Sequence, residues 1–324
     1  MSHYLPLISF LATLFITHLL LRSNVGRSIQ DIPNERSLHV VPVPRVGGIG
    51  VIAGVLLAWA LVYEALNWWL LAPLLLLFAV SLLDDIRGLP VSQRFLAHAV
   101  AAAIFVAGAG GGGQSTLFTF LAFFSVIWMT NLYNFMDGSD GLAGGMALCG
   151  FGVYGVAAYL SGNDVLAMMC FSVAAAALGF LYFNYYPAQI FMGDAGSIPL
   201  GFLAAAIGLR GWQDGIWGWW FPLLVFSPFI VDASVTLIKR SLSGTRITEA
   251  HREHYYQRAV QLGWSHRKVA LFEYALMFVA GIVALLANMQ SSPLRAFLIL
   301  GSIYLVLMIV LDCRWNGNNK KADS

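Results

Sequence analysis

The sequence predicts an all-α, polytopic integral membrane protein: a helical bundle with about eleven transmembrane helices. Of its 324 residues, 59% are hydrophobic and 10% are charged, and the mean hydropathy is +0.75. Soluble globular domains carry roughly 25% charged residues, so the composition excludes that class. We expect a single transmembrane domain over residues 1–315 and a flexible tail over 316–324.

Eleven apolar segments are candidates to cross a bilayer, given that one crossing needs roughly 20 residues and that shorter or tilted crossings occur. The first is followed by Arg22 and has neither a basic n-region nor a small-residue cleavage site, so it is predicted to be a retained helix rather than a signal peptide. The segments lie at 4–21, 47–66, 70–83, 95–109, 117–133, 142–160, 165–183, 196–210, 216–238, 269–287 and 294–311.

The distribution of Lys and Arg predicts the orientation in the membrane. If the segment 22–46 is cytoplasmic, 16 of the 18 basic residues fall on that side, and only Arg210 and Arg295 fall on the other. Basic residues accumulate in cytoplasmic loops, so the N-terminus should lie outside and the C-terminus in the cytoplasm. The formal net charge of +2 gives no reason to expect nucleic acid as a partner.

Adjacent acids end one of the apolar segments on the predicted cytoplasmic side. Asp84 and Asp85 are followed by Gly88 and Pro90, which predict that the helix stops there, with both carboxylates able to turn toward one point. Neighbouring carboxylates repel each other, so either one of them is protonated or a cation neutralises the pair. A hard cation such as Mg²⁺, bound with substrate phosphates, would do so. A solvated helix terminus is the alternative interpretation.

Amides and a further acid recur every three residues at the end of another segment. Asn131, Asn134 and Asp137 would fan across one side of a helix as it leaves the apolar region. Amide donors and acceptors beside carboxylates suit the binding of a base, a sugar or a metal-bound phosphate. Interhelical hydrogen bonding that only stabilises the bundle is the alternative.

One carboxylate, Asp194, lies between Gly193 and Gly196 directly before an apolar helix. This pattern predicts a turn with free backbone N–H groups, favourable for phosphate and for a metal that bridges it. A simple helix N-cap is the alternative, but it explains the acid without explaining both glycines.

The predicted cytoplasmic loop 239–268 holds seven of the 18 basic residues. His251 and His254, at i and i+3, would share a helical face and could bind zinc, yet Arg252 and the tyrosines beside them are more typical of a sugar or phosphate clamp. For the basic residues next to the membrane, the alternative is that they only determine the orientation of the protein in the membrane.

Two arginines outside that loop are further candidates. Arg45 follows two prolines and precedes two glycines, which extend the chain and let it approach another segment closely. Arg94 follows the paired aspartates by ten residues. Snorkelling to lipid headgroups is the alternative role for both side chains.

Together, these motifs predict metal-assisted phosphoryl transfer from a soluble donor to a lipid acceptor. They combine acids, amides, glycine-containing turns and arginines at one face of the protein, next to the hydrocarbon core of the membrane.

The linked motifs resemble the polyprenyl-phosphate N-acetylhexosamine-1-phosphate transferases, of glycosyltransferase family 4 type. This family includes the enzymes that start lipid-linked O-antigen, enterobacterial common antigen, teichoic acid and peptidoglycan assembly. The likeness runs from about residue 31 to residue 267, through the motifs at 31–39, 44–48, 84–85, 131–141 and 191–194. Several motifs in the right order make the resemblance specific.

The resemblance implies a Mg²⁺-dependent reaction, with Mn²⁺ as an alternative ion, at the cytoplasmic face of the bacterial inner membrane. Undecaprenyl phosphate would attack a UDP-amino sugar, releasing UMP and leaving an undecaprenyl-diphosphate sugar. The last cytoplasmic loop has His251-Arg252-Glu253-His254 where the peptidoglycan branch carries three consecutive histidines. The pattern is therefore most similar to O-antigen (lipopolysaccharide) initiating enzymes that use UDP-N-acetylglucosamine or a deoxy-N-acetylhexosamine.

Carried over by motif, the resemblance implies that Asp194 and Asn134 bind the metal and that Asp140 contacts the uracil. Asp84 and Asp85 would bind or deprotonate the lipid phosphate; how Asp84, Asp85 and Asp137 divide the catalytic roles stays open. The residues expected to bind substrate are Arg45, Arg94, Asn131, Asp140, Arg246, His251, Arg252 and His254.

Two other classes of protein are alternatives to a sugar-phosphate transferase. An intramembrane prenyltransferase would bind a prenyl diphosphate through two Asp-rich motifs, but the later motifs here are Asn-rich or carry a single Asp. A secondary transporter would use Asp232 and Glu273 as midplane ion sites, with paired structural repeats, but most acids here gather at one face. The sequence leaves the oligomeric state open, and a homodimer is compatible with it.

Overall fold

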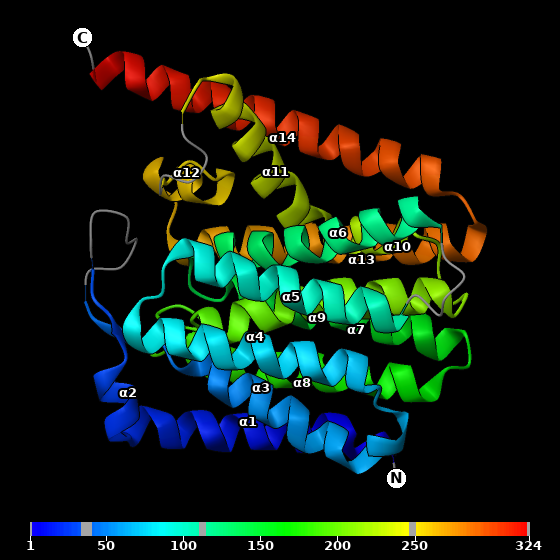
Figure 1. The fold of residues 1–324 in the computed structure, drawn as a ribbon. Helices are drawn as coiled ribbons and strands as arrows, with labels where there is room; N and C mark the ends of the chain where they lie inside the picture. Colours follow the sequence, from blue (N-terminus) through cyan, green and yellow to red (C-terminus); the bar gives the residue numbers. More distant parts are fainter. Residues whose placement is uncertain (1, 34–40, 110–114, 246–250, 323–324) are drawn as a thin grey trace.

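Helices make up almost all of the regular structure (Figure 1). The computed structural model describes residues 2–33, 41–109, 115–245 and 251–322. The helices are α1 (Leu5–Arg22), α2 (Asn24–Ser28), α3 (Gly47–Trp59), α4 (Trp68–Arg87), α5 (Val91–Ala109), α6 (Thr116–Phe135), α7 (Leu142–Leu160), α8 (Asp164–Asn184), α9 (Asp194–Gln213), α10 (Phe221–Val225), α11 (Ser227–Leu242), α12 (Tyr255–Gln261), α13 (His266–Gln290) and α14 (Pro293–Ala322). Short 3-10 turns cover Ser2–Tyr4 and Ala60–Ala65.

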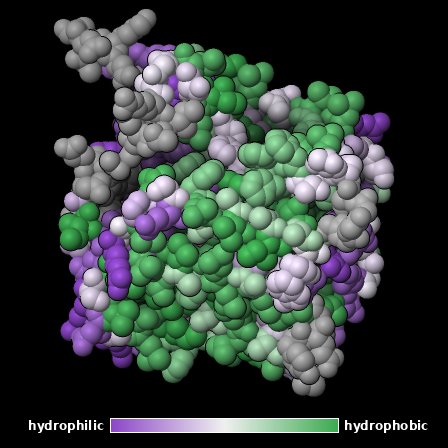
Figure 2. Space-filling model, viewed as in Figure 1, coloured by the Kyte–Doolittle hydropathy of each residue, from purple (hydrophilic) through white to green (hydrophobic). Residues whose placement is uncertain are grey.

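The described residues include eight helices that are long enough and apolar enough to cross a membrane: α1, α4, α5, α6, α7, α8, α13 and α14. Hydrophobic residues cover most of the face seen in Figure 2, and hydrophilic residues gather toward the two ends of the helices. Backbone polar groups in a bilayer must be satisfied within the protein, which helices achieve locally. The prediction of an all-α, multi-pass membrane protein is confirmed.

Each of the eleven apolar segments of the sequence overlaps a helix, including the shorter α3 and the pair α10 and α11. The chain begins and ends at opposite ends of the bundle (Figure 1), as an odd number of passages requires. The count of eleven crossings, and which end faces the cytoplasm, stay predictions.

A central helix, α9, sets the position of the acid motif around Asp194 relative to the other acid motifs. It packs against α3, α4 and α6, and its side chains from Ala195 to Gly208 are almost all buried. Because Asp194 is the first residue of α9, its place is fixed by the packing of the whole helix. α4 ends at Arg87, where Gly88 has a φ of +68°, which confirms the predicted stop after the paired acids.

A two-stranded antiparallel pair, β1 (Gln30–Asp31) with β2 (Val43–Pro44), precedes α3 and pairs Gln30 with Pro44 and Asp31 with Val43. It returns the chain to the end of the bundle where α4 stops and α9 begins. Arg45, directly after β2, is thereby placed beside the α4 terminus.

α14 continues without a break through Ala322, so residues 316–322 of the expected tail are helical. The flexibility and the cytoplasmic position of this tail stay predictions. One expectation about a loop was wrong. The loop 239–268 contains a short helix, α12, and His254 precedes it as its N-cap. His251 and His254 therefore do not share a helical face, although their ring centroids lie only 4.9 Å apart.

Candidate functional site

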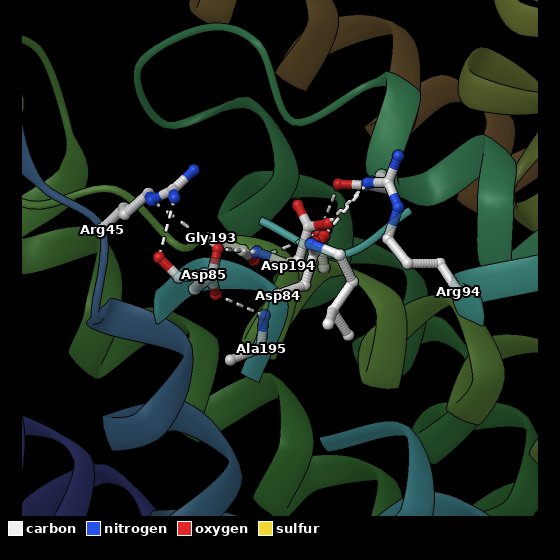
Figure 3. A network of polar contacts seen from close by, with 10 residues as sticks. Arg45, Asp84, Asp85, Arg94, Gly193, Asp194 and Ala195 are labelled. Carbon is white, nitrogen blue, oxygen red and sulfur yellow. Dashed lines mark hydrogen bonds and ion pairs between the residues drawn. The ribbon is translucent and has the colours of Figure 1, made fainter. Parts of the chain in front are cut away.

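Three carboxylates from two helices meet at one end of the bundle, and we call Asp84, Asp85 and Asp194 the carboxylate cluster (Figure 3). The first two end α4, and the third begins α9. Arg45 and Arg94 flank the cluster on opposite sides. The structure thus brings together acids separated by more than 100 positions in the sequence.

Arg94 connects the two helices directly. One of its guanidinium nitrogens lies 3.1 Å from Asp84 Oδ2 and 3.3 Å from Asp194 Oδ2. Asp84 also accepts the backbone N–H of Leu89, in the turn that follows α4. A single cation shared by two carboxylates offsets part of their mutual repulsion.

Asp85, unlike Asp84, binds backbone N–H groups of the turn that begins α9. Its two carboxylate oxygens accept the backbone N–H groups of Asp194 (3.2 Å) and Ala195 (2.9 Å), and its side chain is only 2% exposed. The expectation that the Gly193–Gly196 turn offers free N–H groups was therefore wrong at these two positions. A carboxylate at the start of a helix satisfies donors that have no partner within the helix.

Gly193 is required by the geometry of this turn. Its φ is +70° and its ψ is 173°, a combination that residues with a β-carbon rarely adopt. A β-carbon at this position would lie 2.7 Å from the Arg45 carbonyl oxygen and 2.8 Å from Asp85 Oδ2. The turn can approach the acids only because the side chain is absent.

The glycines after Arg45 make a second close approach. Gly47 N and Gly48 N donate to the carbonyls of Phe191 (2.9 Å) and Met192 (2.8 Å). A β-carbon on Gly48 would lie 2.2 Å from the backbone nitrogen of Gly196. The sequence predicted that this segment approaches another closely, and the partner is the turn that carries Asp194.

Arg45 reaches the cluster from this segment. Its Nη2 donates to the backbone carbonyl of Asp85 at 2.7 Å, and its Nε lies 3.8 Å from Asp85 Oδ1. The arginine is bound to the protein rather than directed to lipid, so the snorkelling alternative does not describe it.

Asn134 joins the turn through Ser197. The Ser197 hydroxyl lies 2.9 Å from Asn134 Oδ1 and 3.1 Å from the Gly193 carbonyl oxygen. The structure therefore places Asn134, on the last turn of α6, beside Ser197, which lies three residues after Asp194.

Asp137 lies just beyond α6, which ends at Phe135, so it does not continue the helical face of Asn131 and Asn134. Burial raises the pKa of Asp137 well above its usual range, and the neighbouring carboxylates of Asp194, Asp85 and Asp31 raise it further. Asp137 therefore belongs to the electrostatic surroundings of the carboxylate cluster.

Two of the predicted substrate-binding residues make contacts away from the cluster. Asn131 Nδ2 donates to the Ile127 carbonyl within its own helix (2.8 Å), and its side chain pairs with the buried His98 on α5. Asp140 accepts the backbone N–H of Ala188 at 3.0 Å, in the loop between α8 and α9. In the described part of the chain, neither is hydrogen-bonded to the carboxylate cluster.

The segment 251–254 lies against the end of α6. The ring of His254 stacks on that of Phe135, with centroids 6.2 Å apart, and its Nδ1 lies 3.3 Å from Asp232 Oδ1. Burial, and then the neighbouring His254 and Arg240, lower the pKa of His251 to about 4, so this ring is neutral at physiological pH. Arg252 is half-buried, and its backbone carbonyl accepts Gln261 Nε2 at 2.7 Å. Arg246 lies outside the described residues.

Three residues of this region were not among the predicted site residues. Ser197 follows Asp194 in the same motif, so its place in the sequence could have identified it as a site residue. Asp31 begins the first motif of the family resemblance, yet nothing in its local sequence indicated that it lies near Asp137. Asp232 was considered only as a transporter site; its backbone partners, Tyr255 and Tyr256, lie more than 20 positions later in the chain.

The described residues contain no group of three or more His, Cys, Asp or Glu side chains arranged to hold a metal ion. A complete metal cage built from protein side chains is therefore not present among them. A cation that keeps waters and binds substrate phosphates needs only one or two carboxylates from the protein.

Comparison with known proteins identifies the family. The family model described as glycosyl transferase family 4 matches residues 67–211, which include the whole carboxylate cluster. The decaprenyl-phosphate N-acetylglucosaminephosphotransferase of Mycolicibacterium smegmatis is 30% identical over 331 residues, covering 86% of this chain and 80% of that protein. The chain belongs to the polyprenyl-phosphate N-acetylhexosamine-1-phosphate transferases.

Other members of the transferase family are similar over most of their length. The probable undecaprenyl-phosphate N-acetylglucosaminyl 1-phosphate transferase of Bacillus subtilis is 29% identical over 312 residues, covering 90% of this chain and 87% of that protein. A phospho-N-acetylmuramoyl-pentapeptide-transferase of Listeria monocytogenes is 27% identical over 328 residues, covering 88% and 98%. The protein is thus a membrane-embedded transferase, and family membership replaces the prenyltransferase and transporter interpretations.

Proposed function

We propose that this transferase moves N-acetylglucosamine 1-phosphate, or the 1-phosphate of a deoxy-N-acetylhexosamine, from a UDP-sugar to undecaprenyl phosphate. The products are UMP and an undecaprenyl-diphosphate sugar. The observation that carries this proposal is the arrangement of Asp84 and Asp194 around Arg94, with Arg45 on the other side of Asp85. This is a site in which two anionic substrates can meet beside fixed cations.

The names of the relatives support an N-acetylglucosamine donor. The Bacillus subtilis and mycobacterial proteins are named for N-acetylglucosamine, and the Listeria protein is named for a muramyl pentapeptide. This chain carries His251-Arg252-Glu253-His254 instead of three consecutive histidines, which favours the former. We propose that the reaction starts a cell-envelope polysaccharide of the O-antigen type at the cytoplasmic face of the bacterial inner membrane.

In the proposed reaction, an oxygen of the lipid phosphate attacks the phosphorus that bears the sugar. A bond forms between that oxygen and that phosphorus, and the bond from phosphorus to the bridging oxygen breaks, so UMP leaves with both bonding electrons. The second pKa of a phosphate monoester is about 6, so the acceptor is already largely a dianion and needs no strong base. Positioning and charge neutralisation remain as the main tasks of the protein.

The contacts support different roles for the paired acids. Both oxygens of Asp85 accept backbone N–H groups of the Asp194 turn, so we assign Asp85 to holding that turn. Asp84 shares Arg94 with Asp194, so we assign Asp84 to the contact with the acceptor phosphate, with Arg94 on the diphosphate. Arg252 and His251 would hold the donor from the loop before α12.

The donor set fits a Mg²⁺ ion, with Mn²⁺ as an alternative. Beyond the effect of burial, the carboxylates of Asp194, Asp85 and Asp31 lie close enough to Asp137 to raise its pKa, so several acids share this region. Asp194 and Asn134 would hold the ion, with Asp137 close to them. When bound, the ion would neutralise charge on the phosphates and help to orient them.

One assay tests the proposal. Purified protein is incubated in detergent with undecaprenyl phosphate, Mg²⁺ and, separately, UDP-N-acetylglucosamine, a UDP-deoxy-N-acetylhexosamine and the UDP-muramyl pentapeptide; the lipid product and the released nucleotide are identified by mass. We expect an undecaprenyl-diphosphate sugar and UMP with one of the first two donors, and no product after chelation. Release of UDP or of inorganic diphosphate, or a product only from the muramyl donor, would overturn the proposal.

A further inference from the structure

Asp232 on α11 is a buried acid that the proposed reaction does not use. It is 6% exposed, and it lies beneath the segment that carries His251, Arg252 and His254. Its Oδ1 accepts the backbone N–H of Tyr255 at 2.8 Å, and its Oδ2 accepts that of Tyr256 at 3.0 Å. Burying a carboxylate away from water is costly unless the group is hydrogen-bonded. The two backbone hydrogen bonds offset this cost, and they indicate the role of Asp232.

The two tyrosine amides are the first two of α12. The first N–H groups of a helix have no acceptor within the helix, and a negative charge close to them is favourable. Asp232 therefore caps α12 from a different helix, and it also lies 3.3 Å from Nδ1 of His254, the N-cap residue. Thr236 Oγ1, one turn further along α11, donates to Asp232 Oδ1 at 3.2 Å and orients the carboxylate.

The capped residues contact the loop that follows α6 and contains Asp137, which we call the acid loop. The Tyr256 hydroxyl donates to the Phe135 carbonyl at 3.3 Å, and a β-carbon on Gly138 would lie 2.1 Å from that hydroxyl oxygen. His254 stacks on the Phe135 ring. Asp137 lies between Phe135 and Gly138 in the chain, so the position of the capped segment and that of Asp137 are linked by direct contacts.

A second acid holds α12 from the side of α14. Asp312 accepts from the Tyr255 hydroxyl and pairs with Arg258 at 3.1 Å, and it also pairs with Lys239 of α11. These contacts attach the outer part of α12 to the bundle. Of these two acids, Asp232 is the one that contacts both the first backbone amides of α12 and His254, so it sets the position of the segment that faces the acid loop.

We propose that Asp232 is a positioning residue for donor binding: it holds His254 and Tyr256 against the loop that contains Asp137, and so places the preceding Arg252 and His251 at the donor. The proposal rests on the proposed function in taking the donor to be a nucleotide sugar. It assigns to Asp232 no contact with either substrate.

Kinetics of Asp232→Asn separate donor binding from the other steps. Asparagine keeps the size of the side chain and one acceptor oxygen, but its NH₂ group cannot accept the second tyrosine N–H, and the charge is lost. A hydrogen bond to a charged group contributes enough to change a binding constant by about tenfold or more. We expect the KM for the UDP-sugar to rise about tenfold, while the KM for undecaprenyl phosphate stays at the wild-type value.

The matched control is Asp214→Asn, which removes an exposed acid paired with Arg210 at 2.7 Å in the turn after α9. This pair lies at the opposite end of α9 from the carboxylate cluster, so both KM values should remain at wild-type level. An equal rise in KM for donor and acceptor in Asp232→Asn would overturn the proposal, because it would indicate a general loss of structure.

Hydrogen exchange gives a measurement that does not depend on the donor. In Asp232→Asn, peptides within 251–261 should exchange faster than in the wild type, since the Tyr255 and Tyr256 amides lose their charged acceptor. Unchanged exchange would refute the positioning role. Faster exchange in a protein that accepts no UDP-sugar would refute the proposed function and leave the positioning role intact.

If Asp232→Asn does not fold, Thr236→Val provides the same test. It removes the hydroxyl that orients the carboxylate and preserves the side-chain volume. We expect faster exchange within 251–261 and a smaller rise in the donor KM. The absence of both effects would overturn the proposal.

Discussion

Replacement of Gly193 by alanine should disassemble the site without unfolding the bundle. The backbone at this position, with a φ of +70° and a ψ of 173°, costs a residue with a β-carbon about 1–3 kcal/mol. The added carbon would lie 2.7 Å from the Arg45 carbonyl oxygen and 2.8 Å from Asp85 Oδ2. Both atoms are nearer than ordinary van der Waals contact, so either the turn or the carboxylate must move.

The expected loss follows from the bonds that such a movement breaks. Asp85 accepts two backbone N–H groups of this turn, and a hydrogen bond to a charged group contributes about 1.5–3 kcal/mol. Loss of both corresponds to about 3 kcal/mol or more, which is about 100-fold in rate if the site must re-form to react. The measurement is transfer of labelled sugar 1-phosphate to undecaprenyl phosphate, together with the thermal midpoint of the purified protein.

Gly215→Ala is the matched control. Its φ is +71°, close to that of Gly193, but a β-carbon there would meet no atom within 4 Å. It separates backbone strain from the steric effect at the site. Equal activity loss in the two variants would refute the steric reasoning, and so would near-normal turnover in Gly193→Ala.

Two further substitutions test the proposed site. Asp194→Asn should nearly abolish transfer while expression and folding remain intact, because the amide keeps the shape but loses the charge that would bind the cation; ordinary turnover would remove the metal assignment. Arg252→Ala should weaken binding of the UDP-sugar by about tenfold, the range for one charged hydrogen bond, and leave binding of undecaprenyl phosphate unchanged. Titration of each substrate separately provides the measurement, and equal weakening for both would contradict the assignment.

The fold class and the local motifs could be predicted because their causes are local. A run of apolar residues specifies a membrane helix wherever it stands, and the Gly88 stop after Asp84 and Asp85 depends on neighbours in the chain. The glycines before and after Asp194 likewise indicated a close approach. These features need no knowledge of which segments meet.

The partners of those motifs could not be predicted, because they come from other parts of the bundle. Nothing near Asp85 indicates that its acceptors are satisfied by the start of α9, so the N–H groups of that turn were taken to be free. The spacing of His251 and His254 is equally compatible with a helix and with the extended segment that precedes α12. The role of Asp232 was unexplained for the same reason, since the backbone amides from which it accepts hydrogen bonds lie on a different element.

The bridge made by Arg94 between Asp84 and Asp194 has a consequence for biogenesis. The two acids are 110 positions apart in the chain, and α9 follows α4 by four long helices. A nascent chain that has inserted only as far as α8 lacks the second acid and the turn that Asp85 holds. The proposed site can therefore be completed only after α9 has been made and has packed against α3, α4 and α6.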